Sequence, residues 1–256
     1  MTIPTPTVPL ISNPATGVFG NGLFQVFGAS GTFTVPFGIS RVRVRVWGAG
    51  GISGNNSSTS GSGGGGFAMK VVDVSSVPTV AVTVGTASSG VNGGTSSFGS
   101  FVSATGGVGT VASATTVSAG GTGVGGDINF TGGSGAIPSA TTNGGSGGVA
   151  GVFGNGGNGV QGAISVFGAS NNSGGGGTSA AGTGLFKLPT TLVSNTSLDF
   201  IGTGAGSAVL ATSATNGGGG PGGNGATGGG GFPGGGSSTQ TASLFLDSYG
   251  LVIVEY

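Results

Sequence analysis

The strongest constraint on this chain is a run in which glycine falls on every third position. The run GGPGGNGATGGGGFPGGG ends at Gly236, and its register positions are Gly219, Gly222, Gly225, Gly228, Gly231 and Gly234. A period of three suits the extended left-handed polyproline-II helix, which has three residues per turn and no internal hydrogen bonds. Where one position of each turn lacks a side chain, neighbouring helices can approach and exchange backbone hydrogen bonds. We therefore predict a lattice of glycine-rich rods.

A second register of the same kind is present at Gly145, Gly148, Gly151, Gly154 and Gly157. Rods of five or six triplets would each span about 45–55 Å at about 3.1 Å per residue. A collagen triple helix would need a longer uninterrupted repeat and far more proline than the ten present. The rod amides must instead pair with neighbouring rods, within the domain or across a trimer interface, because buried backbone groups are rarely left unpaired.

Glycine and proline together favour disorder, but the rest of the composition opposes it. The chain has 66 Gly and 10 Pro among 256 residues, yet 35% of the residues are hydrophobic and only 4% are charged. Disordered chains normally combine low hydrophobicity with high charge. The formal net charge is zero, which favours association. We expect a folded, self-associating protein, with a homotrimer as the favoured state.

Alternating apolar residues predict several strands and almost no helix. The clearest alternation is Arg41–Trp47, where Val42, Val44 and Val46 must share one face. Three arginines in this stretch could indicate nucleic acid, but an antiparallel strand with one buried face explains them better. The other expected strands are 32–36, 66–72, 79–84, a hairpin at 95–104, 185–188, 198–201, 244–247 and 251–254.

These patterns predict an all-β protein with an antiparallel β-sandwich-like sheet. The N-terminal strands and the C-terminal strand build this sheet, which begins near Phe33, and glycine-rich polyproline-II-like rods and long loops are inserted between them. We divide the chain into an extended attachment segment (1–30), a strand-rich part (31–107), rods and loops that face a receptor (108–243) and closing strands (244–256). In the first segment the attachment candidates are Pro4, Pro6, Pro9, Leu10 and Ile11.

The side-chain chemistry argues against catalysis and bound cofactors. The chain has neither His nor Cys, which excludes a Ser-His-Asp triad and most transition-metal sites. Its five acidic residues are scattered without the pattern of a glycosidase pair. We expect no enzyme activity, no cofactor and no metal. No basic patch indicates nucleic acid, no apolar stretch is long enough to span a membrane, and the N-terminus lacks the features of a signal peptide.

Several stretches together resemble the glycine-rich domains of tail fibres and tail-tip adhesins of tailed bacteriophages. The resemblance begins with FTVPFGISRVRVRVWGAGG (33–51), continues through GGGGFAMKVVDV and VTVGTASSGVNGGTSSFGSFVSATGG, and ends with GLVIVEY. It covers residues 31–107 and 217–256, whereas 108–216 are similar in composition only. The resemblance implies binding to a bacterial surface protein or glycan, docking on other tail proteins through the N-terminal segment, and a place in the virion after synthesis in the host cytoplasm.

Loops on a rigid scaffold are where binding function tends to lie. The candidate receptor contacts are aromatic and amide side chains in predicted loops: Phe130, Phe153, Asn155, Asn158, Phe167, Asn171 and Asn172. The alternative for each is structural, with the Phe residues packed in a local core and the Asn residues satisfying turns. Two other functions remain open for the whole chain, a purely architectural virion protein and an ice-binding protein built on glycine rods.

Overall fold

The computed structural model describes residues 23–52, 60–87, 91–109, 116–137, 146–159, 233–236 and 248–256. Within these ranges the regular elements are ten β-strands in two antiparallel sheets, and no α-helix is present. The predicted all-β fold is confirmed. The first sheet has the order β1 (Phe24–Phe27), β10 (Leu251–Glu255), β3 (Arg41–Trp47), β4 (Phe67–Asp73) and β9 (Ile128–Phe130). The second has the order β2 (Gly31–Thr34), β5 (Thr79–Thr83), β6 (Ser96–Phe98), β7 (Val102–Ala104) and β8 (Gly123–Val124).

The alternation in β3 determines which face of the first sheet is buried in the sandwich. Val42, Val44 and Val46 are fully buried, and they pack in one cluster with residues of the second sheet such as Phe33 and Phe98. Burying an aliphatic or aromatic side chain of this size contributes roughly 1.5–3 kcal/mol. The sandwich is therefore stabilised by apolar side chains that interdigitate between two sheets.

A second apolar cluster lies on the opposite face of the first sheet. Trp47 and Phe67 occupy opposed positions on β3 and β4, and their ring centroids are 4.9 Å apart. Val149 and Ala150, which belong to a glycine-rich segment, pack against them. Trp47 thus points away from the three valines, as the period of two predicts. Its side chain is not exposed to solvent, because apolar residues such as Val149 and Ala150 cover it.

The C-terminal strand does not complete the sheet that contains Phe33, as the sequence led us to expect. β10 lies between β1 and β3 in the first sheet, whereas Phe33 lies on β2 in the second. The register pairs Val254 with Val44 and Val252 with Val46. A strand buried on both faces suits this central position, and all five residues of β10 are buried. Residues 244–247, expected to form a further strand, lie outside the described residues.

The domain also begins earlier than residue 31. β1 lies inside the segment assigned to attachment, and its residues pair with β10 from Phe24 opposite Glu255 to Phe27 opposite Val252. Phe27 is buried in the sandwich core. Residues 24–27 are therefore a strand of the domain, because they pair with β10 and bury the ring of Phe27.

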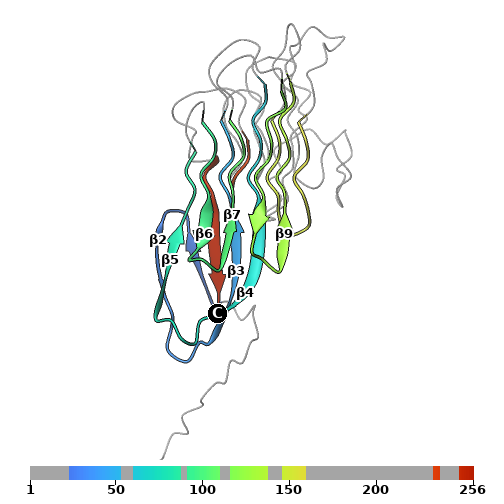
Figure 1. Cartoon of the computed structure of the whole chain (residues 1–256). Helices are drawn as coiled ribbons and strands as arrows, with labels where there is room; N and C mark the ends of the chain where they lie inside the picture. The colour runs from blue at the N-terminus through green and yellow to red at the C-terminus, as the bar shows by residue number, and fades with distance from the viewer. Residues whose placement is uncertain are drawn as a thin grey trace, which may run out of the picture.

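Glycine-rich segments continue from the strands on one side of the sandwich and run roughly parallel to one another (Figure 1). We call these extended non-strand segments rods. The chain rises from a strand into a rod and returns through the next rod to a strand, as in β3, 48–52, 60–66 and β4. The C-terminus lies at the opposite end of the sandwich, which we call the base (Figure 1).

Candidate functional site

The rod at residues 60–66, here called the central rod, shows how the glycine-rich half is held together. The amides of Gly61 and Gly64 donate to Ala136 and Gly133, both in the rod 131–137, at 2.9 Å each. Those of Gly63 and Gly66 donate to Val108 and Thr105 in the rod 105–109. The intervening amide, of Gly65, donates to Gly234. Residues three apart therefore bond to the same neighbour, as expected for three residues per turn.

Three more rods donate to the central rod from its remaining sides. Gly48 and Gly51 donate to the carbonyls of Gly66 and Gly63, again with a spacing of three. Gly121 donates to Gly64 at 2.8 Å, and Gly147 and Ala150 donate to Ser62 and Gly65. Among the described residues, six segments thus surround the central rod: the carbonyls of 105–109, 131–137 and 233–236 accept its hydrogen bonds, and the amides of 48–52, 116–122 and 146–150 donate to it. This arrangement satisfies the backbone groups without strand pairing.

At Gly63, Gly64 and Gly65 the central rod has no room for a side chain, although Ser60 and Ser62 of the same rod are buried with theirs. A Cβ atom added to Gly63, Gly64 or Gly65 would overlap the backbone carbonyls of Ala119, Gly148 and Gly48 respectively. These three carbonyls belong to three different surrounding rods. Ordering glycine costs more backbone entropy than ordering any other residue, and here the close backbone approach that glycine permits offsets that cost through hydrogen bonds on every side.

Outer rods follow a different rule from the one predicted. In the rod 131–137 glycine occurs at 132, 133 and 135, and side chains are present at Thr131, Ser134, Ala136 and Ile137. The rod 105–109 has the same pattern, with Thr105 and Val108 separated by two glycines. The sequence suggested one glycine per turn, but these two rods have two successive glycines between side chains, at 132–133 and at 106–107. A Cβ atom added at any of these four glycines would overlap the backbone of another rod.

The register from Gly145 to Gly157 forms two short rods instead of one long rod. The segments 146–150 and 155–159 are joined by a turn in which Gly151 and Gly154 exchange backbone hydrogen bonds at 3.0 and 3.1 Å. Because the chain reverses at this turn, the register does not form the single rod of about 45 Å that its period predicts. A repeated glycine period does not reveal where the chain reverses, since glycine suits both rod and turn.

Two of the predicted receptor contacts, Asn155 and Asn158, stabilise the edge of the lattice. The side-chain oxygens of Asn155 and Asn158 accept hydrogen bonds from the amides of Thr131 at 2.9 Å and Ser134 at 3.0 Å. Both partners are spaced by three residues, so the amide side chains follow the same period as the rods. Asn92 caps Gly109 in the same way at 3.0 Å. Each Asn supplies an acceptor to an amide that pairs with no described rod.

The two described aromatic candidates lie near the sheets. Phe130 is the last residue of β9, opposite Phe67 in the register, and its ring stacks on Phe67 with centroids 6.4 Å apart. Phe153 lies in the turn between Gly151 and Gly154 and is about half exposed. This turn follows Ala150, which bonds to Gly65 at the sheet end of the central rod. Neither aromatic residue lies at the far ends of the rods.

The remaining candidates lie outside the described residues. They are Phe167, Asn171 and Asn172 among the receptor contacts, Pro4, Pro6, Pro9, Leu10 and Ile11 among the attachment residues, and the expected strands at 185–188 and 198–201. Most of the glycine register from Gly219 is also outside, although Gly234 to Gly236 form part of the lattice. Receptor contact and attachment therefore stay predictions for all these residues.

The far ends of the described rods expose aliphatic side chains that the sequence did not single out. Val91, Val108, Val117 and Ile137 lie on four different rods, and their exposed fractions range from 36 to 57%. Their place follows from hydrogen bonds such as Ile52 to Val91 and Gly63 to Val108, at the ends of rods that start from the sheets. We call this surface the distal end. The sequence signal that could have identified them is an aliphatic residue next to a glycine-rich rod segment, such as Val108 after Gly106 and Gly107.

The base joins the two ends of the described chain. The amide of Tyr256 donates to the carbonyl of Leu23 at 3.0 Å, so the chain enters and leaves the domain at one place. The distal end lies on the other side of the sheets (Figure 1). The two ends of the domain therefore differ, with both ends of the described chain at the base and the described rods on the opposite side of the sheets.

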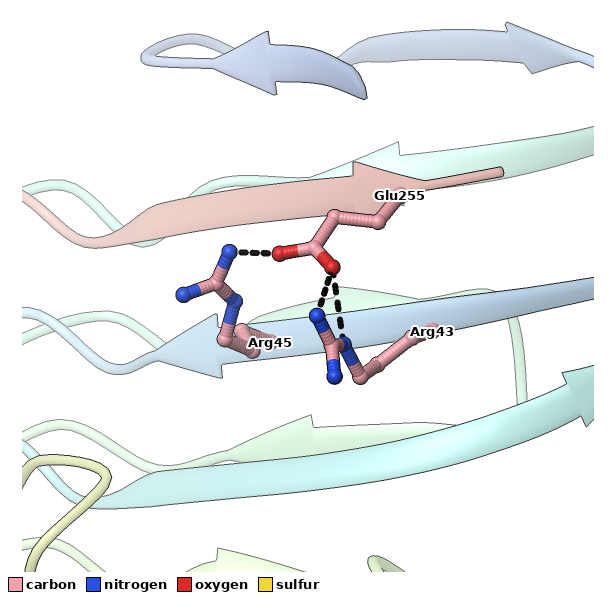
Figure 2. Close-up of polar contacts among 3 residues, drawn as sticks. All are labelled: Arg43, Arg45 and Glu255. Carbon is pink, nitrogen blue, oxygen red and sulfur yellow. Dashed lines mark hydrogen bonds and ion pairs between the residues drawn. The ribbon is translucent and has the colours of Figure 1, made fainter. Parts of the chain in front are cut away.

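One ion cluster fixes the last strand in place. Figure 2 shows Glu255 of β10 between Arg43 and Arg45 of β3. Its carboxylate accepts a hydrogen bond from Arg43 Nε at 2.8 Å and forms ion pairs with both guanidinium groups. Burial lowers the pKa of Arg45, and the adjacent Arg43 lowers it further. Arg43 and Arg45 thus stabilise the pairing of β3 with β10. In the sequence, the one indication of this role is the acidic Glu255 in the terminal strand.

The described residues contain no group of three or more acidic, His or Cys side chains placed to bind a metal ion. Over the same residues, the search for a helix long and apolar enough to cross a membrane finds none.

The fold and the lattice together define a class of protein, an all-β sandwich from which a bundle of hydrogen-bonded glycine rods extends. A family model described as "Glycine-rich domain" matches residues 26–256, and the chain belongs to this family. The match begins in β1 and ends at the last residue, so it spans both sheets and all the described rods. No curated protein matches the chain.

Proposed function

We propose that this chain is a bacteriophage tail fibre or tail-tip adhesin that binds a bacterial surface receptor during adsorption. The observation that carries the proposal is that the two ends of the domain differ. Both ends of the described chain meet at the base, where Tyr256 bonds to Leu23, and the rods extend from the opposite side of the sheets. An adhesin needs this separation, because one end must attach to the particle while the other meets the cell.

The lattice suits the distal end to recognition. Backbone hydrogen bonds on all sides of the central rod hold the rod ends in fixed positions, and segments on a rigid scaffold can vary without disturbing the fold. The exposed Val91, Val117 and Ile137 supply apolar contact there. The resemblance of residues 31–107 and 217–256 to phage tail adhesins also supports an adhesin. It implies a surface protein or glycan as the receptor and other tail proteins as partners at the base.

The first test is binding of fluorescently labelled protein to a panel of intact bacteria, with competition against phage adsorption on any strain that is stained. We expect binding restricted to certain strains, and block of adsorption on those strains. Failure of the folded protein to bind the host of its own phage would contradict the proposal and favour a purely architectural role.

A matched pair of variants locates the binding surface. Changing Val91, Val117 and Ile137 together to Asn should weaken binding to stained cells by tenfold or more. Val124→Asn is the control, because Val124 is 50% exposed but lies on β8, towards the base. Equal loss in both variants would argue against the distal end as the contact surface.

A further inference from the structure

The strand β1 has a free edge made of apolar residues. β1 stands at the end of the first sheet and pairs only with β10 among the described strands. Leu23, Phe24 and Val26 are 56, 57 and 51% exposed, and residues 23–27 include no charged side chain. Free edges of this kind invite another strand, and proteins usually protect them with charge, proline or short length.

The hydrogen-bond pattern shows which backbone groups point outward. Tyr256 donates to Leu23, and in an antiparallel ladder such bonded pairs alternate with non-bonded pairs. Gln25, opposite Val254, therefore directs its amide and carbonyl towards β10. Those of Phe24 and Val26 point to the free edge. The same two residues offer unpaired backbone groups and exposed apolar side chains.

The other three sheet edges lack this combination. β8 has only two residues. β9 has three, and it follows Asp127, whose carboxylate accepts a hydrogen bond from the amide of Val71 at 2.9 Å. β2 exposes Thr32 and Thr34. Among the edge strands that the structure describes, the combination of exposed apolar side chains and outward backbone groups is thus particular to β1.

The chain itself contains a segment whose sequence suits this edge. Twenty-two residues precede Leu23, and they include Ile3-Pro4-Thr5-Pro6-Thr7. In an extended strand the amides of Ile3, Thr5 and Thr7 point to one side and the two prolines to the other. Such a strand can add to a free edge with three donors, and its other side cannot donate further. We propose that residues Ile3–Thr7 of a second copy of this chain add as a strand to the free edge of β1.

We call residues 1–22, which include Ile3–Thr7, the arm. Exchange of the arm between copies fits a domain whose base and rods lie on opposite sides of the sheets. Direct antiparallel pairing of two β1 edges would point the two rod bundles in opposite directions, whereas an exchanged arm lets all copies point the same way. Proline-rich segments are extended and semi-rigid, with about 3.1 Å per residue, so 22 residues reach about 65 Å. The prolines at 4, 6, 9 and 14 favour reach to a neighbour over reversal onto the same β1. The zero net charge leaves association unopposed.

The test measures the molar mass of the full chain by light scattering during size-exclusion chromatography, over a hundredfold range of concentration. We expect wild type at a multiple of the single-chain mass. Thr5→Pro removes the central donor of the arm, and Val26→Lys places a charge at the free edge. Each variant should shift the mass to that of one chain. Val8→Pro and Val124→Lys are the matched controls and should keep the wild-type mass.

Either of two results overturns the proposal. One is a single-chain mass for wild type at every concentration, and protection of the Phe24 and Val26 amides from hydrogen exchange in that monomer would assign the edge to the chain's own arm. The other is an oligomer whose mass neither Thr5→Pro nor Val26→Lys changes. Circular dichroism checks that each variant is folded. No bacterium enters this test, so its failure is distinct from failure of the adhesin proposal.

Discussion

The sandwich and the rod lattice belong to one domain but are stabilised in opposite ways. In the sandwich, side chains such as Val44 and Phe33 are buried between sheets, and removing one leaves a cavity. In the central rod the backbone itself fills the interior, and adding one carbon to Gly64 would overlap Gly148. Apolar side chains fill the interior of the sandwich, whereas the central rod has no room for a side chain at Gly63 to Gly65. Both halves share the strict pairing of backbone groups, with two neighbouring strands for an inner strand and six neighbouring described segments for the central rod.

The largest expected effect comes from adding a methyl group to the central rod. Gly64→Ala should lower the free energy of unfolding by about 4 kcal/mol or more, because its neighbours are rigid backbone that cannot move aside. Urea denaturation measures the change. Gly28→Ala is the control, since a Cβ at Gly28 meets nothing within 4 Å, and it should change stability by less than about 0.5 kcal/mol. Similar values for both variants would contradict the packing described for the lattice.

The converse change in the sandwich removes methyl groups. Val44→Ala leaves a cavity in a fully buried position and should cost about 2–3 kcal/mol. The same substitution at Val124, which is 50% exposed, should cost much less. Urea denaturation of the two variants provides the comparison. If Val44→Ala were harmless, the sandwich core would not carry the stability assigned to it.

The ion cluster links the last strand to β3 and should have an intermediate effect. Glu255→Gln removes the charge between Arg43 and Arg45 and should destabilise the protein by about 1–2 kcal/mol. Thermal unfolding at low and high salt measures it. Arg41→Gln, at an exposed position of the same strand, is the control and should have little effect. A larger loss for Arg41→Gln would show that the arginine row acts as a whole.

The edge of the lattice tests whether a side chain can replace a rod. Asn158→Ala removes the acceptor for Ser134 and should cost about 1 kcal/mol. Asn158→Asp keeps an acceptor in place and should remain close to wild type. Hydrogen exchange at the Ser134 amide provides a local measurement. Unchanged protection in Asn158→Ala would mean that this cap does not stabilise the edge.

The smallest effect concerns acid. Asp73 accepts hydrogen bonds from the Ser75 hydroxyl at 2.6 Å and from the Ser75 amide at 2.9 Å. These two bonds, and then the charge of Arg41, lower the pKa of Asp73 although slight desolvation opposes them. Because the folded pKa lies below the unfolded one, the stabilisation is present above the unfolded pKa and is lost as pH falls through the folded pKa. Ser75→Ala should reduce this loss on acidification, as measured by urea denaturation at several pH values. An unchanged pH profile would show that the turn contributes nothing.

Much of the sandwich could be predicted from the sequence, because alternation along a strand is a local signal. The strand at Arg41–Trp47 and the hairpin at 95–104 follow from period two and from bounding glycines, and the structure confirms both. The partner of each strand is not a local property. For this reason β10 was expected in the sheet that contains Phe33, whereas it lies between β1 and β3 in the other sheet.

The lattice could be predicted in kind and only partly in detail. Period three indicated rods, but the number of glycines per turn depends on how many neighbours a rod has, which is a property of the assembled bundle. For the same reason Asn155 and Asn158 could serve as loop contacts or as caps from sequence alone. Val91, Val117 and Ile137 were missed because short aliphatic residues among glycines carry no signal until the rod ends are placed.

The most direct test of the central claim is amide hydrogen exchange, followed by nuclear magnetic resonance, at residues 61–66. In the lattice every one of these amides donates a hydrogen bond, the amide of Ser62 to the Ser146 hydroxyl and the others to neighbouring rods. We predict protection at all six consecutive positions, comparable with that of β3, whereas β1 should show protection at Gln25 with rapid exchange at Phe24 and Val26 unless the proposed arm covers them. Protection at alternate residues only, or rapid exchange throughout 61–66, would contradict the lattice and the account built on it.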